Sequence, residues 1–95
     1  MKTTVVHCRR DTYDVFVGRP SRWGNPFRIG EHGTRSEVIV RYATWIVQRP
    51  ELMRDLHELR GKRIACYCSP RPCHGDVLAR LADGIAEPPR QLKLI

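Results

Sequence analysis

The sequence contains no long hydrophobic run. No stretch approaches the ~18–20 apolar residues that a membrane-spanning helix needs, and residues 1–6 lack the basic region and apolar core of a secretory signal. Internal repeats and low-complexity segments are also absent. We therefore expect a cytoplasmic domain that makes no membrane contact. Because cytosolic thiols stay reduced, the four cysteines are expected to be metal ligands or reactive thiols before disulfides.

Length and charge narrow the class of protein. Ninety-five residues fit one domain with one core, and an enzyme of this size often completes its cleft with a second copy, so a homodimer is expected. The net charge is +7, and residues 1–30 carry six basic groups against two acidic ones. This excess predicts an anionic partner, namely a nucleotide, phosphate or nucleic acid. The alternative is that the basic groups only serve solubility.

Apolar periodicity predicts three strands and three helices in the order β-β-α-α-β-α. The expected strands cover residues 3–6, 13–17 and 62–68, and the expected helices begin after Thr34, at Pro50 and at Cys73. The strand at residues 62–68 follows a helix after a tight glycine turn, as parallel strands do. The prediction is an α/β fold, a small single-domain Rossmann-like sandwich with a short, mostly parallel sheet over residues 1–85. Residues 86–95 are expected to form an extended C-terminal tail.

Local signals place the ends and the buried faces of these helices. Thr34 and Glu37 have the spacing of a capping box, and Gly61 is placed to close the second helix in a left-handed conformation. The apolar stripes expected to face the core are Val38, Ile39, Tyr42, Trp45 and Ile46, then Leu52, Leu56 and Leu59, and finally Val77, Leu78, Leu81 and Ile85.

Three cysteines and a histidine lie within nine residues, in the pattern Cys-x-Cys-x4-Cys-His. Cys66 and Cys68 are two residues apart on a predicted strand, so both side chains point to one face. The turn at residues 69–72 then brings Cys73 and His74 to the start of the following helix. Zinc takes cysteine sulfur and histidine nitrogen in a tetrahedron. The pattern predicts Cys66, Cys68, Cys73 and His74 as metal ligands. Because of the Cys-x-Cys spacing, the binding of one ion by all four side chains would require a strained geometry.

Two other interpretations of this cluster remain open. A cysteine at a helix N-terminus near a cation has a lowered pKa, so Cys73 is a candidate catalytic nucleophile with His74 or His7 as its base. Alternatively, the cysteines are small core residues, since free cysteine is often buried. Cys8 approaches the cluster if the first and third strands are neighbours.

The segment Gly-Arg-Pro-Ser-Arg-Trp-Gly-Asn-Pro-Phe at residues 18–27 combines cations, aromatic rings and turn residues. Arginine guanidinium groups form paired hydrogen bonds with phosphate, and a tryptophan offers a stacking surface for a base. An asparagine has the donors and the acceptor that recognition of a base edge requires. Alternatively, Trp23 and Phe27 fill the core and the arginines are solvated. The candidate ligand-binding residues are Arg9, Arg10, Arg19, Arg22, Trp23 and Asn25.

Two motifs carry a family resemblance. Trp23-Gly24-Asn25-Pro26-Phe27, and Cys66-x-Cys68-x-Pro70 followed by Cys73-His74-Gly75-Asp76-Val77-Leu78, resemble a domain-of-unknown-function family, number 4326, over residues 4–85. The resemblance implies a bacteriophage or bacterial origin, hence the cytoplasm of a bacterial host if a phage encodes the protein. It implies no activity.

The leading hypothesis is a protein that binds or acts on a nucleotide or nucleic-acid component at a Cys/His site beside an arginine-rich loop, where the cysteines and the histidine either bind zinc as a cofactor or carry out thiol chemistry. The alternative is a non-catalytic accessory protein that binds a host protein or DNA, with structural cysteines. Whether the protein is an enzyme stays open.

Overall fold

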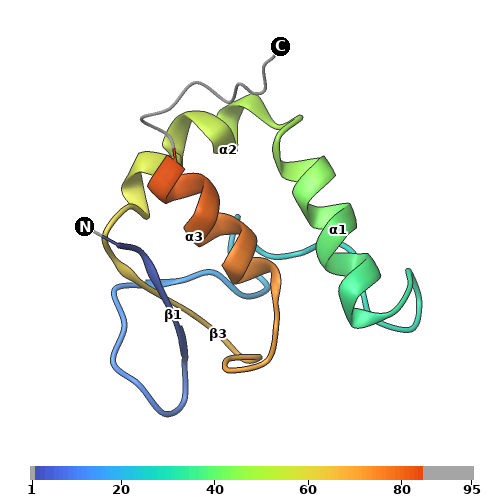
Figure 1. Cartoon of the computed structure of the whole chain (residues 1–95), viewed down its shortest axis with the longest axis horizontal. Helices are drawn as coiled ribbons and strands as arrows, with labels where there is room; N and C mark the ends of the chain where they lie inside the picture. The colour runs from blue at the N-terminus through green and yellow to red at the C-terminus, as the bar shows by residue number, and fades with distance from the viewer. Residues whose placement is uncertain (1, 85–95) are drawn as a thin grey trace.

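The computed structural model describes residues 2–84, which form a mixed α/β domain (Figure 1). Its elements in chain order are β1 (Thr4–His7), β2 (Val15–Phe16), α1 (Arg35–Ile46), α2 (Pro50–Asp55), the 3₁₀ helix η1 (Leu56–Glu58), β3 (Arg63–Cys66) and α3 (His74–Gly84). The predicted α/β class with a short parallel sheet is confirmed. The predictions for Ile85 and for the tail at residues 86–95 lie outside the described residues.

The sheet has three parallel strands with β3 in the centre, between β1 and β2. Val5, Ile64 and Val15 are register partners, as are Val6, Ala65 and Phe16. β2 spans only two residues, fewer than the five predicted, and its pairing with β3 is extended by backbone hydrogen bonds from Asp14 to Arg63 and from Val17 to Ala65. Alternation alone overestimated this strand, because its length depends on the partner strand.

The hydrophobic core lies on one face of this sheet. Ile64 and Cys66 of β3 belong to the main core cluster with residues of α1, α2 and α3, whereas Val6 and Ala65, which are also buried, do not. In Figure 1, α3 lies between β1 and α1, and it contacts both. A Rossmann fold carries helices on both faces of its sheet. Within residues 2–84 the helices cover one face only, so the Rossmann-like expectation is not confirmed.

The capping signals of the sequence act as predicted. The Thr34 hydroxyl accepts the Glu37 N–H at 3.3 Å, and the Thr34 N–H donates to the Glu37 carboxylate at 2.7 Å. Gly61 has a φ of +75°. α1 ends at Ile46, because the N–H groups of Gln48 and Arg49 turn to carbonyls three residues back and Pro50 disfavours helical backbone at the residue before it.

None of the helices within residues 2–84 has the length and apolar character needed to cross a bilayer.

Candidate functional site

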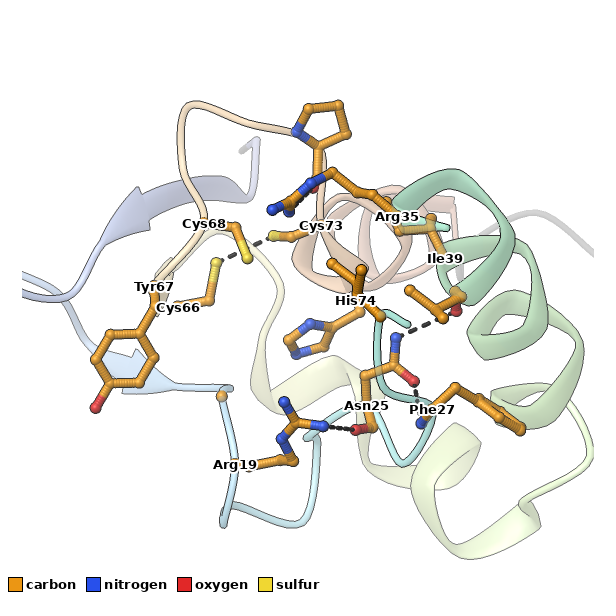
Figure 2. A pocket seen from close by; sticks show the side chains of 14 residues that line it. Arg19, Asn25, Phe27, Arg35, Ile39, Cys66, Tyr67, Cys68, Cys73 and His74 are labelled. Atoms are coloured by element: carbon orange, nitrogen blue, oxygen red, sulfur yellow. Dashed lines mark hydrogen bonds between the residues drawn. The ribbon is translucent and has the colours of Figure 1, made fainter. Parts of the chain in front are cut away.

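A pocket with a volume of about 240 Å³ lies at the carboxyl end of β3 (Figure 2). Three segments far apart in sequence form its wall, namely the loop at residues 18–29, the first turns of α1, and the turn that joins β3 to α3. Ligands in open α/β sheets gather at this place, beside the carboxyl end of a strand and the start of the next helix. The pocket is therefore lined by residues of both sequence motifs, the segment at residues 18–27 and the Cys/His cluster.

The sulfur atoms of Cys66, Cys68 and Cys73 point toward one another on one wall of the pocket (Figure 2) and all lie within 4.8 Å of one another. The Cys66 and Cys73 sulfurs are 3.0 Å apart. β3 ends at Cys66, earlier than the predicted strand over residues 62–68, so Cys68 lies in the bend that follows rather than on the strand. The turn, closed by a hydrogen bond from the Arg71 N–H to the Cys68 carbonyl, returns the chain so that Cys73 faces Cys66 and Cys68. All four cysteines of the chain are free thiols.

His74 does not belong to this sulfur group. Its Nε2 lies 2.7 Å from the backbone carbonyl of Val17, and its ring packs edge-on against Tyr42 at a centroid distance of 5.0 Å. Because a carbonyl only accepts, Nε2 carries the ring proton and Nδ1 is left as the acceptor. Burial lowers the pKa of His74, which favours the neutral ring. Of the four predicted metal ligands, the structure brings together three.

The thiol that ionises readily is Cys66. The hydrogen bond from Cys73 lowers the pKa of Cys66 to about 5, and the backbone N–H groups of Cys68 and Ser69 act in the same direction. That hydrogen bond and burial raise the pKa of Cys73. The expectation that the start of a helix would lower the pKa of Cys73 is therefore wrong for this geometry.

The donor set fits a soft metal ion. Three cysteine sulfurs are ligands that zinc takes at about 2.3 Å, which places sulfurs about 3.8 Å apart in a tetrahedron. The three sulfurs of the group already lie within 4.8 Å of one another, so small side-chain rotations reach that geometry. Cys66, Cys68 and Cys73 would hold such an ion, and all three line the pocket.

Two arginines face the pocket from different elements (Figure 2). Arg19 lies in the loop and donates to the backbone carbonyl of Asn25 at 3.1 Å. Arg35, the first residue of α1, reaches to the β3–α3 turn and donates to the Pro72 carbonyl at 3.0 Å. The sequence analysis missed Arg35. The one available signal is that an arginine in the first turn of a helix opposes the helix dipole.

Other residues that were predicted to bind a ligand instead make contacts that stabilise the loop. Trp23 is only 3% exposed, so the expected stacking surface is instead part of the core. Asn25 lines the pocket, but its side chain donates to the Val38 carbonyl and accepts the Phe27 N–H. Arg22 lies over the Trp23 ring and pairs with Asp55 at 2.7 Å.

Arg9 and Arg10 also lie outside the pocket lining. The Arg9 guanidinium stands 5.5 Å from the centre of the Tyr67 ring, and Arg10 donates to the Ser69 carbonyl. Cys8 is not part of the three-sulfur group, although its N–H donates to the Cys66 carbonyl.

The fold and this pocket define a small α/β domain with a potential metal site of three cysteines. The chain belongs to the family described as domain of unknown function DUF4326, whose profile matches residues 3–84. An uncharacterised 12.4 kDa protein of Enterobacteria phage T4, from the nrdA-td intergenic region, is 33% identical over 84 residues, covering 83% of this chain and 76% of its own length. An uncharacterised protein of Acanthamoeba polyphaga mimivirus is 34% identical over 86 residues, which cover 72% of this chain and 65% of the length of the mimivirus protein. No solved structure matches the chain.

Proposed function

We propose that the protein holds a zinc ion at Cys66, Cys68 and Cys73 and binds a single nucleotide-type anion in the adjoining pocket. The observation that carries the proposal is that three clustered sulfurs and two arginines from separate elements line the same cavity. A setting with reduced thiols, such as the cytoplasm, is part of this proposal.

The chemistry of the pocket wall supports this class of ligand. Phe27, Ile29 and Ile39 offer an apolar surface, while Arg19 and Arg35 carry positive charge. A ligand with a flat apolar part and an anionic group complements both. The volume of about 240 Å³ lies below the roughly 300–1,000 Å³ of common ligand sites, so one base or mononucleotide fits the proposal better than a dinucleotide.

The residues have separable tasks in this proposal. Arg19 and Arg35 bind the anionic group through charge-assisted hydrogen bonds. His74, fixed by the Val17 carbonyl, keeps Nδ1 available as a proton acceptor. A zinc ion held by three thiolates would supply a Lewis acid or an activated water at its open position.

Metal content tests the first half of the proposal. Protein purified under reducing conditions without chelator should carry about one zinc per chain, measured by elemental analysis, because zinc takes ligand sets of this kind. Cys68→Ser should lose the ion. Cys8→Ser is the matched control, since Cys8 and Cys68 are both partly exposed free thiols and only Cys68 is in the group. Metal-free wild-type protein, or equal zinc loss in both variants, would refute the zinc site.

Ligand titration tests the second half. Nucleoside monophosphates titrated calorimetrically should bind the wild-type protein, and Arg35→Ala should weaken binding about tenfold or more, as expected for a lost hydrogen bond to a charged group. Arg80→Ala, an exposed arginine of α3 outside the pocket, should change nothing. Zinc without nucleotide affinity would instead favour a non-catalytic protein with a structural metal.

A further inference from the structure

The face of the sheet that the helices leave uncovered carries a row of aromatic rings. Phe16 of β2 is the register partner of Ala65, on the side opposite the core residue Ile64. The Phe16 ring packs edge-on against Tyr67, with centroids 5.7 Å apart, and Tyr13 follows at 6.5 Å from Phe16. These are three of the seven aromatic residues of the chain, so their grouping at the surface needs a reason.

Two rings of this row are open to solvent. Tyr67 is 55% exposed and Tyr13 is 44% exposed, whereas Trp23 and Tyr42 are buried. Burying a large aromatic side chain stabilises a fold more than burying most other side chains, yet these two tyrosines contribute little to the core. Tyr13 precedes β2 and Tyr67 follows β3, and exposed tyrosines in such a row suit the stacking of successive bases.

Arginines surround the row. Arg9 stands over the Tyr67 ring at 5.5 Å, Arg10 donates to the Ser69 carbonyl, and Arg63 donates to the Thr12 carbonyl. None of these three arginines takes part in a salt bridge within residues 2–84. The nearby carboxylates of Asp11 and Asp14 accept the backbone N–H groups of His7 and Arg63. Within residues 2–84, no carboxylate therefore pairs with these three guanidinium groups, and an anionic partner can do so.

We propose that this surface, formed by Tyr13, Phe16 and Tyr67 with Arg9, Arg10 and Arg63, binds single-stranded nucleic acid. The tyrosine rings stack on bases, and the arginines contact the phosphates. The net charge of +7 attracts the polyanion over a longer range. Duplex grooves are read by protruding helices or ribbons, whereas exposed aromatic rings match splayed bases. Tyr67 also lines the pocket, whereas Tyr13, Phe16 and the three arginines do not, so the proposal needs neither zinc nor a ligand in the pocket.

Fluorescence anisotropy with a labelled 12-nucleotide oligothymidine at low salt tests the proposal. Tyr67→Ala should weaken binding about 5- to 150-fold, the range for losing one stacked base, while Tyr67→Phe should bind like wild type because it keeps the ring. Val40→Ala, at a 65% exposed position of α1, is the control. Arg9→Ala should lower affinity and reduce the salt slope by about one.

Several outcomes would overturn the proposal. They are no binding by the wild-type protein at low salt, equal affinity of Tyr67→Ala and Val40→Ala when both melt like wild type, and loss of binding in Arg35→Ala but not in Arg9→Ala, which would assign the nucleic acid to the pocket that Tyr67 also lines. A wild-type dimer that Tyr67→Ala converts to a monomer, with oligothymidine affinity unchanged, would show that a second copy covers this face.

Discussion

Tyr42 shows at the scale of one residue how the loop and the helices are joined. Its side chain is fully buried, its hydroxyl donates to the Trp23 carbonyl at 2.6 Å, and its ring supports His74. Burial raises the pKa of Tyr42 above its usual value, so the phenol stays protonated and remains a donor. One hydroxyl thus holds the loop motif against the helix that follows it.

Removal of this hydroxyl should destabilise the domain. Tyr42→Phe leaves the buried Trp23 carbonyl without this donor, which costs about 1–3 kcal/mol of unfolding free energy. Urea unfolding followed by circular dichroism measures the difference. Tyr13→Phe removes a hydroxyl from an exposed tyrosine and should leave the midpoint unchanged. Equal midpoints for wild type and Tyr42→Phe would show that this hydrogen bond contributes nothing.

At the scale of elements, the close approach of α3 to β1 positions the sulfur group. A Cβ on Gly75 would stand 3.1 Å from a methyl of Val5 and 3.2 Å from the Cys73 sulfur. The Gly75 N–H also donates to that sulfur at 3.3 Å. Glycine at this position lets the start of α3 lie directly on the sheet, which places Cys73 opposite Cys66.

The two glycines of α3 provide a matched test. Alanine in a helix gains up to about 1 kcal/mol over glycine, while overpacking a tight contact costs about 1–3 kcal/mol. Gly75→Ala should therefore lower the free energy of unfolding by about 1 kcal/mol, whereas Gly84→Ala, where a Cβ meets nothing within 4 Å, should not lower it. Chemical denaturation measures the free energy of unfolding of both variants. A Gly75→Ala protein as stable as Gly84→Ala would show that α3 can shift away from the sheet.

At the scale of the whole molecule, the sulfur group joins the central strand to the last helix. Cys66 ends β3 and Cys73 precedes α3, and both are nearly fully buried. An ion held here would link the sheet to the helical layer across a core that is small, as it must be in a chain of this length. In the proposed zinc-bound state, metal binding and folding are coupled.

Chelation should therefore lower the thermal stability. At a free zinc concentration a hundredfold above its dissociation constant, binding stabilises the folded state by about 2.7 kcal/mol, so stripping the ion should lower the Tm by about 10–20 °C. Differential scanning calorimetry with and without chelator measures this change. Cys68→Ser should melt at one temperature in both conditions, and an unchanged wild-type Tm would contradict a folded-state metal.

The sequence by itself determined the order of the elements, the capping box at Thr34, the left-handed turn at Gly61, and the meeting of three cysteines. Each of these follows from local geometry, because short turns, helix spacing and backbone preference act within a few residues. The three cysteines lie within eight residues, so the bend at Cys68 and the short turn at residues 69–72 bring Cys73 back beside Cys66 and Cys68.

Only the tertiary structure decided which side chains reach the pocket and which face of the sheet the helices cover. Arg35 enters the pocket through a contact with Pro72, 37 residues away, and His74 turns to the Val17 carbonyl across 57 residues. Arg9 lies over the ring of Tyr67 and is not part of the pocket lining, where the sequence had placed it. Such pairings depend on how separate elements pack, and no local preference of the chain encodes them.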